Sequence, residues 1–256
     1  MNLACCVWAI EGSDNTILAR AAALGFEWID VRPFAFSSEG ARQEIREQGL
    51  SVSCIAASFG MPEDARLSSP ERDARFGAAT YLDRTLAYGA ALGASAAYVV
   101  PDEDPSSLDR YAAELKSVAD RGGEMGVRVC VEHFPGSALP TAAGTIAFLR
   151  EVGHPNLFLL LDIGHAQMSE ENPASIISDA GPLLGYVHLD DNDGSRDLHL
   201  GLTDGILTEA ALADCIAALR DIAYRGNLSL ELHPGLPDPL DALGKSREIA
   251  LRAMHE

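Results

Sequence analysis

Four side chains of the kinds that bind metal ions stand at the ends of four successive apolar runs in the second half of the chain. They are Glu132 in VRVCVEH, Asp162 in LFLLLD, His188 in LLGYVHL and Glu231 in NLSLELH. Carboxylate oxygens and imidazole nitrogens suit divalent cations, and three carboxylates brought together repel one another unless a cation neutralises them. We therefore predict one shared divalent metal ion. Mn²⁺ and Zn²⁺ are the preferred identities of this ion, and Mg²⁺ and Co²⁺ are alternatives. The competing interpretation is four separate polar strand ends, each hydrated or paired with a lysine or arginine.

For these side chains to meet, the runs that carry them must lie side by side in one sheet. Apolar runs of strand length alternate with helical stretches along the chain, which predicts a parallel sheet with crossover helices. Eight such pairs in 256 residues, without the GxGxxG of an open dinucleotide-binding sheet, favour a single (β/α)8 TIM barrel over residues 1–256, whose active site forms where the strands end. The expected strands are 3–9, 27–33, 50–57, 95–100, 127–133, 157–162, 183–189 and 227–233. The expected helices are 16–25, 39–49, 70–92, 106–125, 141–153, 173–180, 208–220 and 240–254.

The composition disfavours several classes of partner. The formal net charge is −19, with 19 Lys and Arg against 38 Asp and Glu, whereas binding to a phosphate backbone requires clustered cationic side chains. No apolar run approaches the ~20 residues of a membrane span. The first residues, MNLACCVWAIEG, lack the basic region of a secretory signal, and the five cysteines show no CxxC spacing. We therefore expect a cytoplasmic protein with reduced thiols that binds neither nucleic acid nor membrane.

Several motifs of the second half resemble those of the xylose isomerase-like TIM barrel superfamily. They are LLLDIGHA, VHLDDNDGSRDLHLG and LSLELHP, with VCVEH upstream. This group includes sugar isomerases, ketose 3-epimerases, inosose-converting enzymes and AP endonucleases of the endonuclease IV type. The resemblance implies that Glu132, Asp162, His188 and Glu231 bind one shared metal ion. It also implies that Glu132 and Glu231 transfer protons.

A second layer of polar residues follows the same strands. His165 lies in DIGH, and Asp197 and His199 lie in RDLH. In endonuclease IV-like proteins the matching residues bind a further zinc, whereas in sugar epimerases the histidine matching His165 contacts substrate. The three residues are therefore expected to bind either substrate hydroxyls or a second metal ion, against the alternative of a surface loop with incidental histidines. The histidines that complete the nuclease's metal site have no counterpart in SFG (58–60) or PDE (101–103), which argues against a nuclease.

Other side chains near the expected strand ends leave two interpretations each. Arg196 could orient a carbonyl, carboxylate or phosphate, or be a hydrated surface arginine. Trp8 and Phe59 could cover an apolar face of a sugar or belong to the core. Because alternate strand residues point the same way, His233 could reach the site beside Glu231, while His133 is expected to face away.

The predicted activity is that of a sugar or sugar phosphate isomerase or epimerase acting on a small sugar or cyclitol. One of Glu132 and Glu231 would remove the proton α to a carbonyl and the other would return it, through an enediolate that the metal ion stabilises. The alternative is an inosose or keto-sugar dehydratase or lyase at the same site. An endonuclease IV-type phosphodiesterase and a non-catalytic sugar-binding barrel are less favoured. The sequence is also compatible with a homo-oligomer.

Overall fold

The eight strands close into a parallel barrel in sequence order, which confirms the predicted (β/α)8 TIM barrel. In the computed structural model, which describes residues 1–255, each strand pairs with the next and β8 pairs with β1. The strands are β1 (Asn2–Cys6), β2 (Trp28–Val31), β3 (Ser51–Ala56), β4 (Ala96–Val99), β5 (Arg128–Glu132), β6 (Leu157–Asp162), β7 (Leu184–Leu189) and β8 (Asn227–Leu230).

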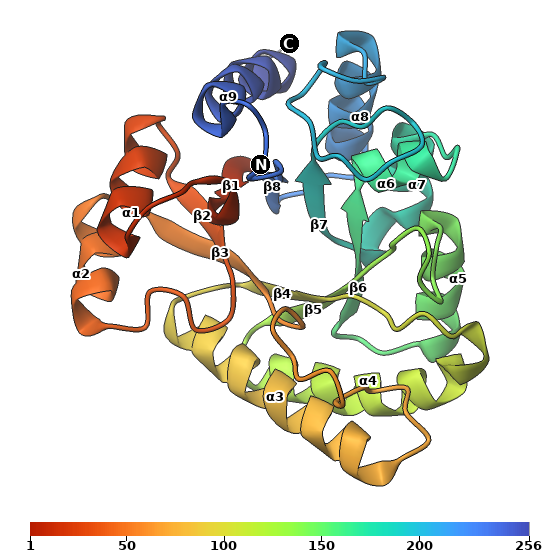
Figure 1. The fold of residues 1–256 in the computed structure, drawn as a ribbon. Coiled ribbons are helices and arrows are strands. Elements are labelled where there is room, and N and C mark those ends of the chain that lie inside the picture. Colours follow the sequence, from red (N-terminus) through yellow and green to blue (C-terminus); the bar gives the residue numbers. More distant parts are fainter. Residues whose placement is uncertain (256) are drawn as a thin grey trace.

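Helices surround the strands on the outside of the barrel (Figure 1). Within residues 1–255 the α-helices are α1 (Asp14–Ala23), α2 (Glu39–Glu47), α3 (Arg72–Ala91), α4 (Leu108–Glu124), α5 (Ala142–Val152), α6 (Ile163–Met168), α7 (Pro173–Ala180), α8 (Glu209–Asp221) and α9 (Pro239–His255). Short 3-10 helices are η1 (Val7–Ala9), η2 (Pro105–Ser107) and η3 (Gly181–Leu183). Several helices begin at a hydroxyl that accepts a hydrogen bond from a backbone N–H three residues on, such as Ser38 before α2 and Thr208 before α8. These caps satisfy otherwise unpaired backbone donors, so the sequence determines these helix starts locally.

Several elements differ from those expected, and three of these differences lie at strand ends. The strand expected over 3–9 is β1 followed by η1, because β1 finds a partner on β2 only as far as Cys6, which pairs with Asp30. The strand expected over 227–233 ends at Leu230. The unexpected helix α6 starts directly after Asp162, whose carboxylate accepts a hydrogen bond from the His165 N–H at 2.8 Å. Strand ends depend on which neighbour remains available for pairing, and the tertiary arrangement decides this.

The apolar core has two parts. Outward-facing strand residues pack against the helices in the larger part, and the smaller part fills the barrel. The buried residues of the inner part are Cys54, Ala56, Ala96, Tyr98, Cys130, Leu160 and Tyr186. Because the interior is filled, substrate can reach the barrel only at its ends.

No helix within residues 1–255 is both long enough and apolar enough to cross a lipid bilayer. The five cysteines are buried and unbridged. Buried free thiols of this kind pack as small apolar side chains.

Candidate active site

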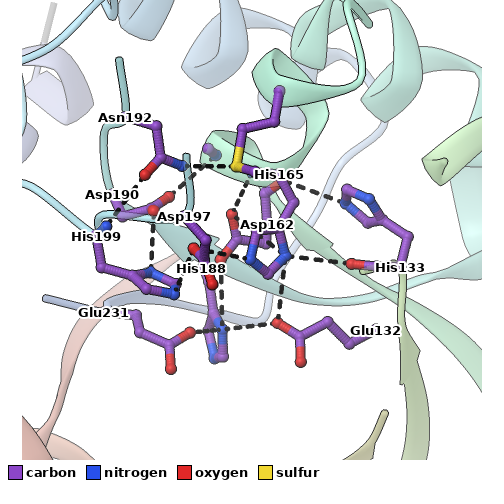
Figure 2. Close-up of polar contacts among 12 residues, drawn as sticks. Glu132, His133, Asp162, His165, His188, Asp190, Asn192, Asp197, His199 and Glu231 are labelled. Atoms are coloured by element: carbon purple, nitrogen blue, oxygen red, sulfur yellow. Dashed lines mark hydrogen bonds and ion pairs between the residues drawn. The ribbon is translucent and has the colours of Figure 1, made fainter. Parts of the chain in front are cut away.

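The four side chains that end the predicted strands meet at the carboxyl-terminal mouth of the barrel. Glu132 and Asp162 are the last residues of β5 and β6, His188 is the penultimate residue of β7, and Glu231 directly follows β8. The register of the barrel places Asp162 opposite His188. One potential ligand atom from each of the four residues lies within 4.8 Å of those of the other three. Figure 2 shows Glu231 and Glu132 on either side of His188.

Within this group, His188 contacts each of the three carboxylates. Its Nδ1 atom lies 2.5 Å from Oε2 of Glu231, 3.8 Å from Oε1 of Glu132 and 4.0 Å from Oδ2 of Asp162. All four residues are buried. Within residues 1–255, Asp162 Oδ2 and both ring nitrogens of His188 lack a partner with hydrogen-bond geometry, and the ring nitrogens have only ion-pair contacts with carboxylates.

These unpartnered atoms test whether the site fits a metal ion. Each buried polar atom left without a partner costs roughly 1–3 kcal/mol, so several at one place require a compensating ligand. Three carboxylates and one imidazole, with ligand atoms this close together, are a donor set that divalent cations accept. The residues present therefore fit a divalent cation.

Without a cation the four residues perturb one another's protonation. Burial raises the pKa of Glu132 to about 8, and the neighbouring carboxylate of Glu231 adds to this shift. Burial also raises the pKa of Asp162. For His188, burial would lower the pKa, but the nearby carboxylates, Glu231 foremost, raise it overall. The metal-free cluster thus keeps protons that a bound cation would displace.

His165, Asp197 and His199 form a second cluster beside the first. Asp197 Oδ1 lies 3.3 Å from Nε2 of His165 and 3.0 Å from Nε2 of His199. The Nδ1 atom of His165 lies 3.8 Å from Oε1 of Glu132, which connects the two clusters. Burial opposes protonation of His165, yet Asp162 and the other nearby carboxylates raise its pKa to about 10. The structure thus brings together all three residues of the predicted second layer, with His165 as a hydrogen-bond donor.

Asp190 extends this second cluster and was not singled out from the sequence. It is buried, its Oδ2 lies 3.0 Å from Nδ1 of His199, and its Oδ1 accepts a hydrogen bond from the Gly164 N–H at 3.0 Å. A Cβ atom on Gly164 would lie 2.5 Å from the Asp190 carboxylate, so this approach requires glycine. Asp190 lies in the turn-like sequence DDND (190–193), and nothing in that pattern separates it from its acidic neighbours.

Asp30 adds a buried carboxylate inside the barrel, and the sequence analysis did not identify it either. It accepts hydrogen bonds from the hydroxyls of Tyr186, at 2.6 Å, and Ser53. Its Oδ2 lies 3.7 Å from Nε2 of His188, on the side of the ring away from the carboxylate cluster. The only signal in the sequence is one acidic residue inside the apolar run WIDV (28–31).

The two clusters open into a cavity of about 260 Å³. Its lining residues are Trp8, Arg32, Phe59, Val100, Glu132, Phe134, His165, Asp197, His199, Glu231, Leu232, His233 and Pro234. His233 is in this lining, as predicted, although β8 ends at Leu230 and strand alternation does not explain its position. His133 faces away, with Nε2 at 3.2 Å from the backbone oxygen of Asp162. A wider groove of about 750 Å³ lies outside the barrel between α4 and α5 and contains none of the clustered residues.

Arg196 lies apart from this cavity. Its Nη2 atom is 2.6 Å from Oδ2 of Asp193, and its side chain is 72% exposed. Hydrogen bonds from Ser195 and Arg196 hold the pKa of Asp193 below its usual range, as expected of a local surface pair. This placement favours the interpretation of Arg196 as a hydrated surface arginine.

The fold and the clusters define a TIM barrel whose candidate metal centre occupies the carboxyl-terminal mouth. The family profile described as Xylose isomerase-like TIM barrel matches residues 18–253. The chain therefore belongs to this family, which confirms the resemblance inferred from the motifs.

Two relatives that align over more than four fifths of the chain are named as sugar epimerases. The chain is 29% identical over 244 residues to L-ribulose 3-epimerase of Mesorhizobium japonicum, covering 88% of this chain and 78% of the relative. It is 27% identical over 238 residues to D-psicose 3-epimerase of Agrobacterium fabrum, covering 84% of this chain and 77% of the relative. Among solved structures, a D-tagatose 3-epimerase-like protein superposes with a TM-score of 0.84 at 19% identity, over 100% of this chain and 97% of that chain. At this identity the structural match shows a shared fold.

Proposed function

We propose that the protein is a divalent-metal-dependent sugar epimerase or isomerase that moves a proton at the carbon next to a carbonyl group. The observation that carries this proposal is that Glu132 and Glu231 belong to the four-residue cluster and also line the cavity. The relatives named as L-ribulose and D-psicose 3-epimerases support a ketose as substrate. A cation held by Glu132, Asp162, His188 and Glu231 would supply Lewis-acid stabilisation of the negative charge that develops on substrate oxygens.

Glu132 and Glu231 are the proton-transfer groups in this proposal. They come from β5 and β8 and flank His188 from two sides (Figure 2). One carboxylate removes the proton from the substrate carbon, and the other returns a proton from the opposite side, which inverts that carbon. Return of the proton to the neighbouring carbon would give an isomerase instead.

The second cluster binds substrate hydroxyl groups. His165, Asp197 and His199 offer polar side-chain atoms to the cavity, while Trp8 and Phe59 form an apolar wall that limits access of water. The competing role for these residues is a second metal ion. Elemental analysis of the purified protein separates the two roles, because the first requires one equivalent of metal per chain and the second requires two.

Glutamine substitutions test the proton-transfer roles. We expect Glu132→Gln and Glu231→Gln each to slow epimerisation of L-ribulose and D-psicose by about 10²–10⁴-fold, because glutamine cannot accept the proton. Incorporation of deuterium from D₂O into the reacting carbon measures the same step. The control is Glu47→Gln, an exposed glutamate of α2 that lies outside the cavity. Metal content of each variant is measured in parallel, since loss of the ion would slow turnover by another route.

Two outcomes would redirect the proposal. Unchanged deuterium incorporation in both variants would remove Glu132 and Glu231 from the mechanism. Loss of water from an inosose or keto-sugar, detected by mass spectrometry, would assign the dehydratase alternative to the same residues.

A further inference from the structure

Arg32 directly follows β2 and lines the same cavity as Glu132 and Glu231. Alternate residues of a strand point to the same side. Asp30, two residues earlier, points into the barrel toward Tyr186 and His188. Arg32 therefore faces inward as well, one layer closer to the mouth.

Two aromatic rings hold the Arg32 guanidinium in place. Its central carbon lies 5.6 Å from the centre of the Trp8 ring and 5.8 Å from the centre of the Phe59 ring. The two rings are stacked, with centres 6.2 Å apart and planes inclined by 23°. Cation–π contacts of this kind fix the position of a guanidinium. They leave free its N–H donors, which lie in the plane of the guanidinium itself.

Those donors have no protein partner. Within residues 1–255, Arg32 makes no side-chain hydrogen bond and no ion pair, although the chain has 38 acidic residues against 19 Lys and Arg. Among these described residues, Arg32 is also the only lysine or arginine in the cavity lining, where Glu132, Asp197 and Glu231 contribute carboxylates. An unpaired arginine that lies beside two aromatic rings in an acid-rich cavity has its donors available for a ligand.

The chemistry of arginine indicates what that ligand carries. The flat fork of N–H donors matches a carboxylate or phosphate with two parallel hydrogen bonds. Neutral hydroxyl groups do not require a cationic donor, and His165, Asp197 and His199 already offer donors and acceptors for them. Arg32 thus adds to the site a capacity that a neutral sugar would leave unused.

We propose that the substrate of this site is anionic, a sugar acid or a sugar phosphate whose carboxylate or phosphate group binds Arg32. The inference rests on the proposed function in that the reacting carbon lies near Glu132 and Glu231. It adds the class of the substrate and a residue that determines specificity.

Binding of unreactive polyols tests the inference without turnover. Isothermal titration calorimetry of the Mn²⁺-loaded protein compares ribitol with D-ribonate and D-ribitol 5-phosphate, each of which carries an anionic group at one end of the same five-carbon chain. We expect at least one anion to bind about 10-fold or more tightly than ribitol, because a charge-assisted hydrogen-bond pair contributes this much affinity. The better of the two anions identifies carboxylate or phosphate as the recognised group.

The arginine variants assign the preference to this residue. We expect Arg32→Gln to abolish the preference for the anion and Arg32→Lys to weaken it. The matched control is Arg84→Gln, because Arg84 lies over the Phe34 ring at 5.4 Å but outside the cavity, and this variant should keep the preference. Arg32 is exposed, so the variants are expected to fold, and their melting temperatures verify this.

Two results would overturn the inference. One is equal binding of ribitol and both anions by the unmodified protein. The other is an anion preference that survives in Arg32→Gln, which would place the anion on the metal ion instead. Failure of this inference can be distinguished from failure of the proposed function. Deuterium exchange on neutral ketoses without an anion preference would contradict only the inference. Anion binding through Arg32 without deuterium exchange would contradict only the proposed function.

Discussion

Asp30 is a buried carboxylate beside the imidazole of His188, where it faces the ring nitrogen directed away from the cluster. It accepts hydrogen bonds from Tyr186 and Ser53, which fix its orientation. A carboxylate near the outer nitrogen of a ligating histidine selects the tautomer and orientation that bind metal. We therefore expect Asp30→Asn to weaken Mn²⁺ affinity by about 10- to 100-fold, as measured by calorimetric titration.

The matched control for Asp30→Asn is Asp64→Asn, which changes an exposed aspartate. An effect confined to Asp30 would assign it the positioning of His188. Equal Mn²⁺ affinities in Asp30→Asn and the unmodified protein would reduce Asp30 to a structural partner of Tyr186. A melting curve of the metal-free variant distinguishes lost affinity from general destabilisation.

The loop after β7 shows how one segment arranges several polar side chains. The Asp191 carboxylate accepts hydrogen bonds from the backbone N–H groups of Gly205 at 2.6 Å and Leu207 at 2.9 Å. The Asn192 side chain accepts from the N–H groups of Leu198 and His199. His199 takes a left-handed φ of 41°, which such contacts must stabilise against its intrinsic cost. The backbone of this loop is therefore organised around acceptors supplied by its own first residues.

At the scale of the strands, β7 approaches β6 and β5 closely at Gly185. A Cβ atom there would lie 2.7 Å from Cys130 Sγ and even closer to Phe158. We expect Gly185→Ala to lower the free energy of unfolding by about 1–3 kcal/mol through overpacking. Urea denaturation followed by circular dichroism measures this change.

The same substitution at Gly40 on helix α2 is the control. A Cβ atom there would have the Ser38 hydroxyl as its nearest neighbour, at 4.0 Å. Gly40→Ala should therefore stabilise the protein by a few tenths to about 1 kcal/mol through helix propensity. Equal effects at the two glycines would contradict the argument from packing.

For the whole molecule, a cation bound by Glu132, Asp162, His188 and Glu231 would link the four successive strands β5 to β8. Mass action at a free Mn²⁺ concentration 100 times Kd adds about 2.7 kcal/mol to the free energy of unfolding. In a chain of 256 residues this should raise Tm by about 5–10 °C, measured by differential scanning calorimetry with and without the ion.

Asp162→Asn provides the comparison for this prediction. Asp162 is fully buried, and its Oδ2 atom has no hydrogen-bond partner within residues 1–255. Asparagine removes the charge while keeping the shape, so the variant should show a much smaller rise in Tm with Mn²⁺. If the ion left Tm of the unmodified protein unchanged, the four-residue cluster would not be a metal centre.

The sequence by itself determined the alternation of strands and helices, the closed barrel and the strand-end residues Glu132, Asp162, His188 and Glu231. These features are local, because apolar periodicity, helix caps and a polar residue at the end of an apolar run can be read within a few positions. The barrel then fixes where the strand ends lie, so the fold class alone predicts their convergence.

Only the tertiary structure identified Asp30, Asp190 and Arg32 as neighbours of that cluster and placed Arg196 outside the cavity. Asp30 and His188 lie on β2 and β7, far apart in the sequence, and their 3.7 Å approach depends on packing across the barrel interior. Arg32 and Arg196 are alike in residue type, yet one is held by Trp8 and Phe59 and the other pairs with Asp193. Such partners depend on strand register and loop path, which hydrogen bonds and packing between distant segments decide.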